Sequence, residues 1–481
     1  MEKRVAIVGA GISGLLACKY AASKGLNPVV FEAQDQVGGL WNHTIESTRL
    51  QIPKETFQFS DFPWPSSADT FPHNTQLRDY LQSYAQHFQI LQYIQFNSKV
   101  ISIDYVGHDD DMQFWELWGG AGKAFGSKGK WHLKVIDTKQ DSIKEYVAEF
   151  VVLCIGRFSG LPDIPEFPSG CGPDVFSGKV LHSMDFAAMD NASAAELIKG
   201  KKVAIIGSAK SAVDIAFECS NANGNDNPCM VIQRTVHWML PDPQPWGVSF
   251  GFLCFSRFSE LCLHKPGEGL FSSVVATMLS PLLFFLPENF YDKVEDGSIV
   301  FEKSQKVSFC REGLILDGEE SPLKADIVIL ATGYKGDEKL KNIFASTTFQ
   351  NWIEGSPTSI IPLYRQMIHP RIPQLAVIGY SESLSNLFIF EMRSKWLAFF
   401  LDEAFQLPSI KEMERDIKSW DKYMKKYAGN GKFRRSCIGG AHIWYIDQLC
   451  KDIGINPRRK KGVLSEFFEP YGIEDYLGLG P

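Results

Sequence analysis

Two stretches of the chain repeat one hydrophobic pattern, in which a short apolar run leads into a small-residue turn and then an amphipathic segment. The first, RVAIVGAGISGLLACKYAASKG, predicts a buried strand at residues 5–8, a turn at residues 9–14 and a helix that ends near Gly25. The second, GKKVAIIGSAKSAVDIAFECS, predicts a strand at residues 203–206, a turn and a helix. An apolar strand follows each helix. The pattern predicts an α/β fold with two dinucleotide-binding, Rossmann-like domains.

The first turn carries the complete GxGxxG spacing. Gly9 permits a tight turn, Gly11 lets the backbone approach a pyrophosphate, and Gly14 lets the helix pack closely on the strand. Glu32 ends the next strand, eighteen residues after Gly14, where a carboxylate can hold the hydroxyl groups of a ribose. The combination predicts a dinucleotide site.

A second glycine pair suggests which dinucleotide binds there. DQVGGLW, residues 35–41, places Gly38 and Gly39 just past the acid, followed by Leu40 and Trp41. This segment resembles the second FAD signature of flavoproteins that bind two dinucleotides, and it favours FAD over NAD. Near the other end of the chain, ADIVILATGY predicts a buried strand that runs into Thr332 and Gly333, where backbone can meet a flavin.

The second turn keeps the spacing but only one of its glycines, Gly207, because Ala209 and Ala212 fill the other two positions. A methyl group at Ala209 narrows the gap through which a phosphate meets backbone N–H groups. Arg234 stands where Glu32 stood in the first unit, and a guanidinium there favours the 2′-phosphate of NADPH over a bare ribose, unless it is an ordinary surface charge. The residues expected to bind NADPH are Gly207, Ser208, Ser211 and Arg234.

The order of the motifs predicts a discontinuous FAD-binding domain, residues 1–160 and 325–481, with an NADPH-binding domain inserted at residues 161–324. A chain of 481 residues with 44% hydrophobic content exceeds what one core usually holds. The inserted domain carries an apolar insert at about residues 240–290. Its most apolar part, residues 270–286, is too short for a membrane-spanning helix of roughly 20 residues, so buried helices are expected, with a membrane-touching or substrate-guiding insert as the alternative.

Charge and cysteine content narrow the function. The net charge is −7 and no basic run exceeds RRKK, so nucleic acid is not an expected partner. No cysteine lies between Cys18 and Cys154, which excludes a disulfide reductase with its redox pair after the Gly-Gly segment. The scattered histidines indicate no metal site. The ten scattered cysteines and an N-terminus that enters a strand at once predict a cytoplasmic protein.

The stretch FSGKVLHSMDF supplies the most specific motif. It matches FxGxxxHxxx(Y/F) on Phe176, Gly178, His182 and Phe186, while LATGY and FSDFPWP match two further segments. Together they resemble the flavin-containing monooxygenase family, in particular plant members of the defence-related, amine N-hydroxylating subgroup. The resemblance implies that NADPH reduces FAD, and that one atom of O2 passes through a C4a-peroxyflavin to a nucleophilic nitrogen or sulfur of a small metabolite.

The resemblance also suggests two catalytic residues. His182 would couple the FAD and NADPH domains rather than abstract a proton, which agrees with its lack of an acid–base partner. LQIPKE carries Gln51 where many relatives have asparagine, so a hydrogen bond to the peroxyflavin or NADP⁺ would be made differently. Ala209 would weaken NADP⁺ retention and divert reducing equivalents to H2O2.

Three functions remain open: oxygenation of an amine or thioether, Baeyer–Villiger oxygenation of a ketone, and a low-turnover FAD-binding protein or NADPH oxidase. Phe186-Ala187 argues against the second, whose fingerprint usually ends in tryptophan followed by proline or aspartate. The incomplete second turn motivates the third. We expect a monomer or homodimer with no transmembrane segment and at most weak membrane association.

Overall fold

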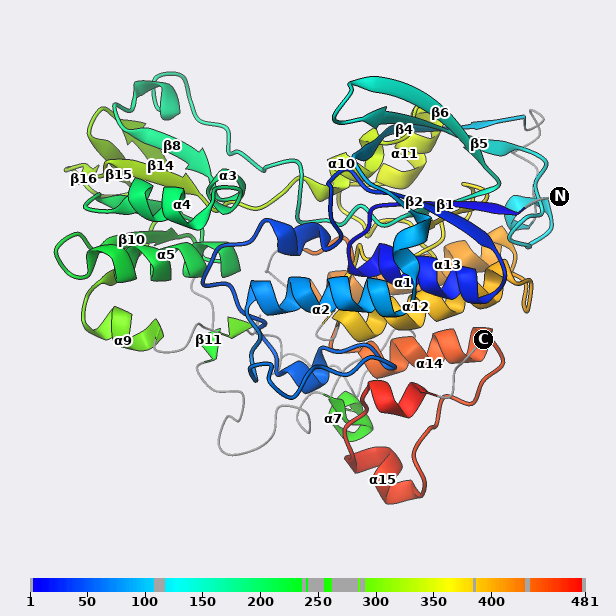
Figure 1. Cartoon of the computed structure of the whole chain (residues 1–481). Coiled ribbons are helices and arrows are strands. Elements are labelled where there is room, and N and C mark those ends of the chain that lie inside the picture. Colours follow the sequence, from blue (N-terminus) through cyan, green and yellow to red (C-terminus); the bar gives the residue numbers. More distant parts are fainter. Residues whose placement is uncertain are drawn as a thin grey trace.

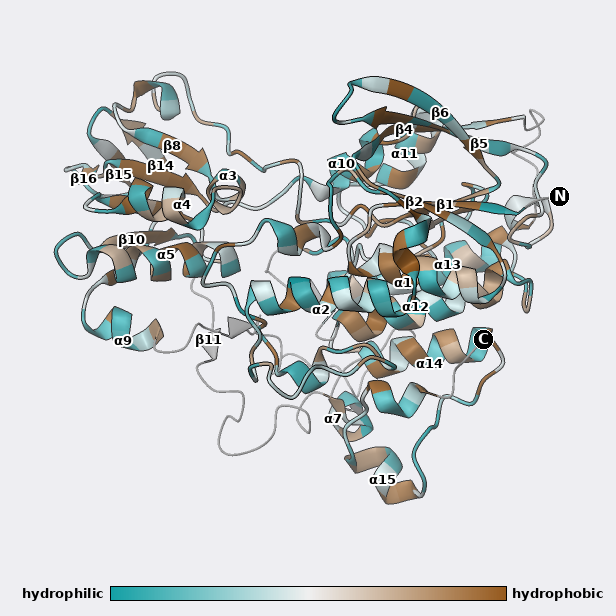
Figure 2. Cartoon of the chain, in the orientation of Figure 1, coloured by the Kyte–Doolittle hydropathy of each residue, from teal (hydrophilic) through white to brown (hydrophobic). Residues whose placement is uncertain are grey.

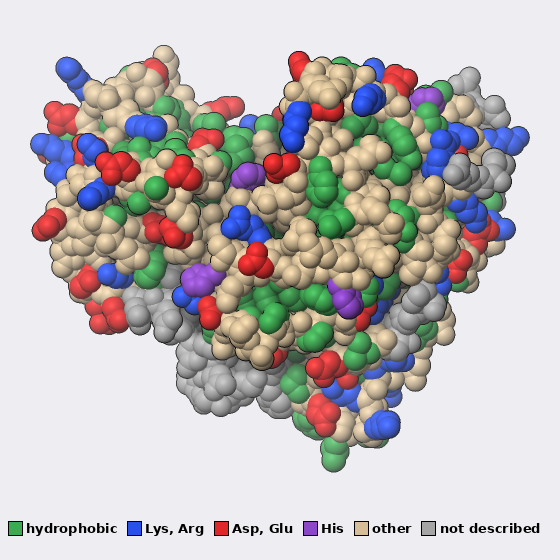
Figure 3. All heavy atoms as spheres, viewed as in Figure 1, with side chains coloured by type: hydrophobic (Ala, Val, Ile, Leu, Met, Phe, Trp, Pro, Cys, Tyr) green, Lys and Arg blue, Asp and Glu red, His purple; other side chains and the backbone are tan. Residues whose placement is uncertain are grey.

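The computed structural model folds the chain into two lobes (Figure 1). The residues that it describes are 3–107, 117–235, 239–240, 255–261, 284–285, 290–383, 386–428 and 433–477. Each lobe is built around a five-stranded parallel sheet. The space-filling view shows a notch between the lobes at its upper edge (Figure 3).

The sheet of the first lobe has the order β18-β7-β1-β2-β3. Its strands are β1 (Arg4–Val8), β2 (Asn27–Phe31), β3 (Ile94–Gln95), β7 (Phe150–Leu153) and β18 (Leu375–Val377). Alternation along β1 sends Val5 and Ile7 to one core, and Ala6 and Val8 to another. Both faces of the sheet are therefore buried, as parallel sheets require.

Helices cover one face of this sheet, and a mixed layer covers the other. The first core contains α1 (Ile12–Ser23), α2 (Asn74–His87) and α12 (Asn386–Leu401), and α2 alternates apolar and polar residues (Figure 2). The second core contains the antiparallel strands β4 (Ser98–Val106), β5 (Lys130–Asp137) and β6 (Ser142–Ala148), with α10 (Gly336–Asn342) and α11 (Thr347–Glu354).

The second lobe repeats the design with the order β13-β10-β9-β17-β8. Its strands are β8 (Lys179–His182), β9 (Val203–Ile206), β10 (Cys229–Gln233), β13 (Ile299–Lys303) and β17 (Ile327–Leu330). One face packs on α4 (Asn191–Ile198), α5 (Lys210–Asn223) and α9 (Phe290–Glu295). The other packs on the antiparallel β14 (Val307–Cys310), β15 (Gly313–Leu316) and β16 (Leu323–Lys324). The two parallel sheets confirm the predicted α/β class.

The pairing of β17 moves one predicted boundary. The return to the first domain was expected at residue 325, but β17 pairs with both β8 and β9 in the second sheet. All four of its residues are buried, so it is an inner strand of that sheet. The chain therefore crosses back at residues 331–335. Which cofactor each lobe binds remains a prediction at this stage.

The remaining elements lie around these two lobes. They are α3 (Ser183–Ala187), α7 (Arg257–Leu261), α13 (Ile410–Ala428), α14 (His442–Asp452), α15 (Val463–Phe468), β11 (Met239–Leu240), β12 (Phe284–Phe285), β19 (Glu382–Ser383) and β20 (Cys437–Gly439). Short 3-10 helices lie at Gly39–Asn42, Lys54–Thr56, Ile90–Tyr93, Trp118–Gly120, Pro173–Val175 and Ile473–Tyr476.

Most of the predicted apolar insert, including residues 270–283, falls outside the described residues. Its described ends meet, because β11 pairs with β12 in parallel. Of the helices in the described ranges, none combines the length and apolar content needed to cross a membrane.

Two buried histidines should make the folded state sensitive to acid. Burial lowers the pKa of His369 to about 3 and that of His442 to about 4, so both rings are neutral in the folded chain at neutral pH. The unfolded chain binds these protons near pH 6.5, the ordinary value. The free energy of unfolding should therefore fall as the pH drops below 6.5, by about 1.4 kcal/mol per pH unit for each ring.

This effect can be measured from the thermal unfolding midpoint between pH 7.5 and about 4.5. The midpoint should fall with pH, and His442→Gln should make that fall shallower because one of the two groups no longer titrates. The same pH dependence in both proteins would contradict this explanation.

Candidate functional site

The first glycine turn leaves the N-terminus of α1 open. Gly9 adopts φ +102°, and a Cβ on Gly14 would lie 1.8 Å from the Gly9 carbonyl oxygen, so both positions need glycine for the turn to form. Gly11 is different, because its φ is −72° and an added Cβ would meet Gly39 Cα at an ordinary 3.6 Å. No side chain caps α1 at Gly11. The open helix end and the missing methyl group suit a phosphate.

The predicted second FAD signature lies directly against this turn. The Gly38 N–H donates to the Ala10 carbonyl at 3.2 Å, and Gly39 stands back to back with Gly11. Leu40 is exposed, whereas Trp41 packs against the first core. Asn42 Oδ1 is buried and, in the part of the chain that the structure describes, has no hydrogen-bond partner. The turn at residues 9–14 and the Gly38–Gly39 pair thus form one surface, and the unpaired Asn42 Oδ1 lies beside it.

Glu32 follows β2 at the edge of the same turn. Its carboxylate is buried and accepts hydrogen bonds from the Ala10 N–H at 2.6 Å and the Gln34 N–H at 2.9 Å. The acid is thus where the sequence predicted it, between the first turn and the end of β2. Its oxygens are held by backbone donors that fix the turn.

The second turn has the same backbone arrangement in spite of its alanines. The Gly207 N–H donates to the Ile232 carbonyl at 2.9 Å, as the Gly9 N–H donates to Phe31 at 2.8 Å. Gly207 has φ +130°, and Ala209 stands at the N-cap position before α5 without a side-chain cap hydrogen bond. Ala209 is exposed, and Ser208 and Ser211 are half-buried beside it. The turn can therefore present backbone N–H groups to a phosphate, past one extra methyl group.

Arg234 comes directly after β10, as Glu32 comes directly after β2. It is exposed, and its backbone carbonyl accepts a hydrogen bond from Gln305 at 2.8 Å. This bond fixes the backbone at the strand end, and the Arg234 side chain forms no ion pair with the described residues.

His182 lies where β8 passes into α3. Its Nδ1 accepts from the Met184 N–H at 3.1 Å, while Nε2 is buried and has no hydrogen-bond partner among the described residues. The ring meets Tyr334 edge-on, with centroids 5.6 Å apart. Burial lowers the pKa of His182, and the nearby Gly333 backbone only partly opposes this. The imidazole is therefore neutral at neutral pH, with one nitrogen unsatisfied.

The other members of the FxGxxxHxxx(Y/F) motif are structural. Phe176 packs on Phe309, with ring centroids 5.9 Å apart, and Phe186 lies in the core beneath α5. A Cβ on Gly178 would lie 2.3 Å from the Asp326 carbonyl oxygen. These residues hold β8 against β17 and so fix the position of His182.

The LATGY segment follows β17, a strand of the second sheet. A Cβ on Gly207 would lie 2.2 Å from the Ala331 carbonyl oxygen, so the segment lies against the second turn. The expected contact of Thr332 and Gly333 with a flavin stays a prediction. The Asp163 N–H donates to the Gly333 carbonyl at 2.9 Å, and Thr332 Oγ1 donates to the Asp163 carbonyl. The two crossings between the lobes therefore run side by side, with His182 next to them.

Gln51 lies in a loop of the first lobe that reaches α5. Just before it, Thr48 Oγ1 donates to Asp214 at 2.8 Å and the Ser47 N–H donates to Glu218 at 2.8 Å. Asp214 is buried and pairs with Lys210. Sequence reasoning missed this contact between the lobes, although the acid within the apolar run AVDIA was a signal. Gln51 itself is half-buried.

No group of three or more potential metal ligands gathers anywhere in the described ranges. The residues brought together are instead glycine turns, uncapped helix ends and a neutral histidine at the crossing between two sheets. Uncapped helix ends of this kind suit the phosphate groups of an organic cofactor.

Comparison with known proteins identifies the family. The family model described as flavin-binding monooxygenase-like matches residues 2–281 and 284–466. A probable flavin-containing monooxygenase 1 of Arabidopsis thaliana is 38% identical, over 99% of this chain and 96% of the relative. A putative flavin-containing monooxygenase 2 of the same plant is 38% identical, over 95% and 98%.

Solved structures share the fold. The S-allyl-L-cysteine S-oxygenase from Allium sativum aligns with a TM-score of 0.64 at 20% identity, over 94% of this chain and 89% of that one. An open structure of cyclohexanone monooxygenase aligns with a TM-score of 0.63 at 15% identity, over 93% and 97%. The chain therefore belongs to the flavin-binding monooxygenase-like family of oxidoreductases, with FAD and NADPH as its cofactors.

Proposed function

We propose that this monooxygenase transfers one oxygen atom from O2 to a nucleophilic nitrogen or sulfur of a small metabolite. One contact carries the proposal. The ring of His182, from the FxGxxxHxxx(Y/F) motif, packs edge-on against the ring of Tyr334, from the LATGY motif, and Ala331 of the same segment lies against Gly207. Phe186-Ala187 departs from the fingerprint of ketone-oxidising relatives. Similar proteins include an N-oxide-forming dimethylaniline monooxygenase of Cavia porcellus at 26% identity and the S-oxygenase of Allium sativum.

The two open helix ends would hold the two cofactors. The turn at residues 9–14, with Gly38 to Trp41 and Glu32, would bind FAD, and Gly207, Ser208, Ser211 and Arg234 would bind NADPH. When bound, FAD supplies the oxygen-activating chemistry. The protein then has to orient the two cofactors and exclude water. Because FAD would supply the chemistry and the protein would only orient the cofactors, the site needs no acid–base pair.

His182 would act as a positioning residue at this junction. Its lowered pKa keeps the ring neutral, and because Nδ1 accepts from the Met184 N–H, Nε2 carries the proton and can donate a hydrogen bond without the ring carrying charge. His182 lies next to the two segments that connect the lobes, near Asp163 and at residues 331–335. From there it would couple the NADPH-binding domain to the FAD-binding domain. Gln51, on the loop that contacts α5, would supply an amide to the same region.

Replacing His182 by alanine should slow flavin reduction or loosen NADP⁺ about tenfold, since one hydrogen bond is lost, while FAD stays bound. His182→Asn is the matched control, because asparagine can cap α3 at the Met184 N–H but lacks the ring that meets Tyr334. Stopped-flow kinetics measure the rate of flavin reduction in each variant, and titration measures its affinity for NADP⁺. An alanine variant with unchanged reduction rate and NADP⁺ affinity would contradict the role.

Replacing Ala209 by glycine should tighten NADP⁺ binding roughly five- to tenfold, because a phosphate can approach the backbone more closely. Less H2O2 should then form per NADPH consumed. Ala212→Gly is the control: this residue is fully buried in α5, so its change alters stability without widening the turn. If Ala209→Gly leaves the H2O2 yield unchanged, retention of NADP⁺ is not limited by this methyl group.

The proposed substrate class is tested with the FAD-loaded chain, NADPH, air and a panel of amines, thioethers and ketones. We expect N-oxygenated or S-oxygenated products by mass analysis. An ester or lactone as the main product would instead establish Baeyer–Villiger oxygenation. NADPH consumption matched by H2O2 with every compound would establish an NADPH oxidase.

A further inference from the structure

Residues 44–50, which we call the strap, link the two lobes. The strap belongs to the first lobe and comes shortly before α2, and Figure 1 shows the chain there reaching toward α5 of the second lobe. Ile45 of the strap is buried in the core of the second lobe, together with apolar residues of α5 and of the second sheet. A segment of one lobe thus supplies a core residue to the other.

Thr48 binds both lobes at once. Its carbonyl accepts a hydrogen bond from the Asn74 N–H of α2 at 3.1 Å, and its hydroxyl donates to Asp214 of α5 at 2.8 Å. One residue earlier, the Ser47 N–H donates to Glu218, also of α5, at 2.8 Å. The strap therefore holds α2 on one side and α5 on the other.

The two acids that hold the strap lie on one face of α5, which starts at the second glycine turn. Lys210, Asp214 and Glu218 are spaced four residues apart, so they share a face of the helix. Lys210 is the first residue of α5, directly after Ala209, and it pairs with Asp214. The strap is thus attached close to the helix end that would hold the phosphates of NADPH.

The burial of Asp214 indicates a role in positioning. Asp214 is 2% exposed, and taking its carboxylate out of water costs free energy that the pair with Lys210 and the bond from Thr48 must offset. Apolar side chains in place of such a buried pair often leave a protein equally stable, so added stability does not account for it. What the pair fixes is the place of Thr48 on α5.

Gln51 comes directly after the strap and lies between two further anchors. The Leu50 N–H donates to the Pro72 carbonyl at 3.0 Å, and the Lys54 N–H donates to the Thr70 carbonyl at 2.8 Å. These bonds tie the chain on both sides of Gln51. A displacement of the strap would therefore carry Gln51 with it.

We propose that Thr48 and Asp214 are positioning residues that fix Gln51 relative to NADP⁺ at the second turn, so that retention of NADP⁺ depends on them. The strap has two states, docked on α5 or released, and Gln51 meets NADP⁺ only in the docked state. A strap that favours bound NADP⁺ must, by linkage, be stabilised in turn when NADP⁺ binds. The inference rests on the proposed binding of NADPH at the second turn, but it is independent of which atom the enzyme oxygenates.

Hydrogen exchange of residues 44–51 and titration with NADP⁺ test the proposal on the FAD-loaded full chain. NADP⁺ should slow exchange in the unchanged protein, above all at the Ser47 N–H, which donates to Glu218. Thr48→Val keeps the shape of the side chain but removes the hydroxyl. It should abolish this slowing and weaken NADP⁺ binding about five- to tenfold. Thr48→Ser should restore both, because serine keeps the hydroxyl.

A double substitution tests whether the two residues act together. Asp214→Asn removes the charge that strengthens the bond from Thr48, and it should also weaken NADP⁺ binding. Asp214→Asn combined with Thr48→Val should weaken binding by less than the product of the two single effects, since both changes affect one interaction. Single effects that multiply fully would show that the two residues act separately, against the proposal.

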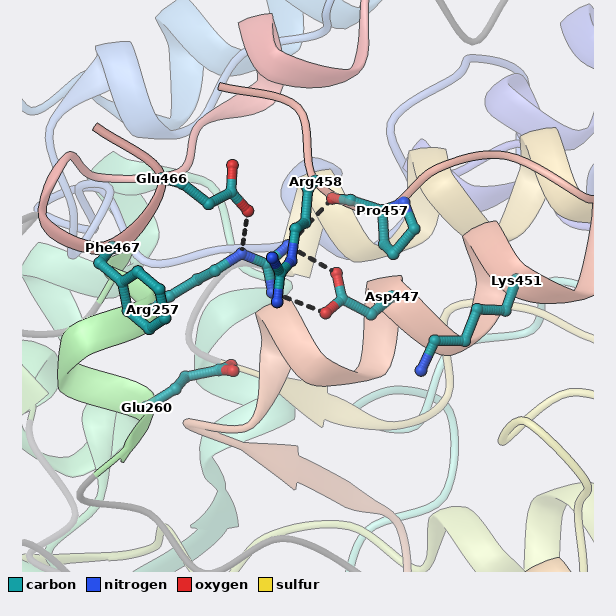
Figure 4. A pocket seen from close by; sticks show the side chains of 8 residues that line it. All are labelled: Arg257, Glu260, Asp447, Lys451, Pro457, Arg458, Glu466 and Phe467. Atoms are coloured by element: carbon teal, nitrogen blue, oxygen red, sulfur yellow. Dashed lines mark hydrogen bonds and ion pairs between the residues drawn. The ribbon is translucent and has the colours of Figure 1, made fainter. Parts of the chain in front are cut away.

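Asp447→Asn is the matched control. It removes the charge of another paired acid, which binds Arg257 at 2.6 and 2.9 Å and joins α14 to α7, elements that carry neither the strap nor the second turn (Figure 4). This variant should lower the unfolding midpoint but leave NADP⁺ affinity and the exchange of the strap unchanged. An equal effect of Asp447→Asn and Asp214→Asn on NADP⁺ affinity would reduce the role of Asp214 to general stability and overturn the proposal.

Two further results would overturn the proposal, and Arg234→Ala distinguishes their causes. The results are unchanged NADP⁺ affinity in Thr48→Val, and exchange of the strap that is the same with and without NADP⁺. If Arg234→Ala still weakens NADP⁺ binding, only the role of the strap has failed. If Arg234→Ala also leaves the affinity unchanged, the proposed NADPH site at the second turn has failed with it. Product analysis decides separately which atom is oxygenated.

Discussion

Replacing Gly11 by alanine is expected to leave the fold intact and remove most of the affinity for FAD. The backbone of Gly11 is ordinary, and an added Cβ would meet only backbone atoms of Gly39, with Cα at 3.6 Å and N at 4.0 Å. The methyl group would nevertheless stand where the pyrophosphate has to approach the N–H groups of α1. Losing one or two hydrogen bonds to a charged group costs about 3 kcal/mol, or roughly 100-fold in affinity.

Flavin content after purification and FAD titration of the apoprotein measure this effect, with the unfolding midpoint of the apoprotein as a check on folding. Gly472→Ala is the control, because that residue also has φ below zero and open space around it. Gly14→Ala should behave differently and fail to fold, since its Cβ would overlap the Gly9 carbonyl. Gly11→Ala with full FAD affinity would place the pyrophosphate somewhere other than this turn.

Replacing Arg234 by alanine is expected to lower kcat/KM for NADPH about 100-fold and to change kcat/KM for NADH little. A guanidinium at the end of β10 can form charge-assisted hydrogen bonds with a 2′-phosphate, together worth about 3 kcal/mol. NADH lacks that phosphate, so the substitution removes nothing that it uses. The exposed position of Arg234 means that folding should be unaffected.

Steady-state rates with both nucleotides test this prediction. Lys201→Ala removes an exposed cation from the same lobe, before the start of β9, and should leave the preference for NADPH unchanged. If Arg234→Ala lowers both rates equally, or lowers neither, the cation that selects NADPH lies elsewhere.

Local pattern was enough to predict the two strand-turn-helix units. Residues 5–8 and 203–206 are apolar throughout and lead into small residues, and both fold as buried parallel strands before a helix. The place of Glu32 and Arg234 also follows from local spacing, because each stands directly after the second strand of its unit. Such features depend on steric limits within about thirty residues, which the sequence displays directly.

Features that depend on distant pairing could not be predicted in the same way. ADIVILATGY reads as a buried strand in either lobe, and only its pairing with β8 and β9 assigns it to the second sheet. The hydrogen bond from Thr48 to Asp214 joins residues 166 positions apart. Gln51 and His182 lie on separate elements, a loop and a strand end, and no local pattern specifies the distance between them.

Incubation with ¹⁸O2, NADPH and an accepted amine or thioether tests the central claim most directly. Oxygen transfer predicts one ¹⁸O atom in the N-oxygenated or S-oxygenated product and one in water, with one NADPH consumed for each product molecule when no H2O2 escapes. A product without the label, with both labelled atoms recovered in H2O2, would contradict the claim.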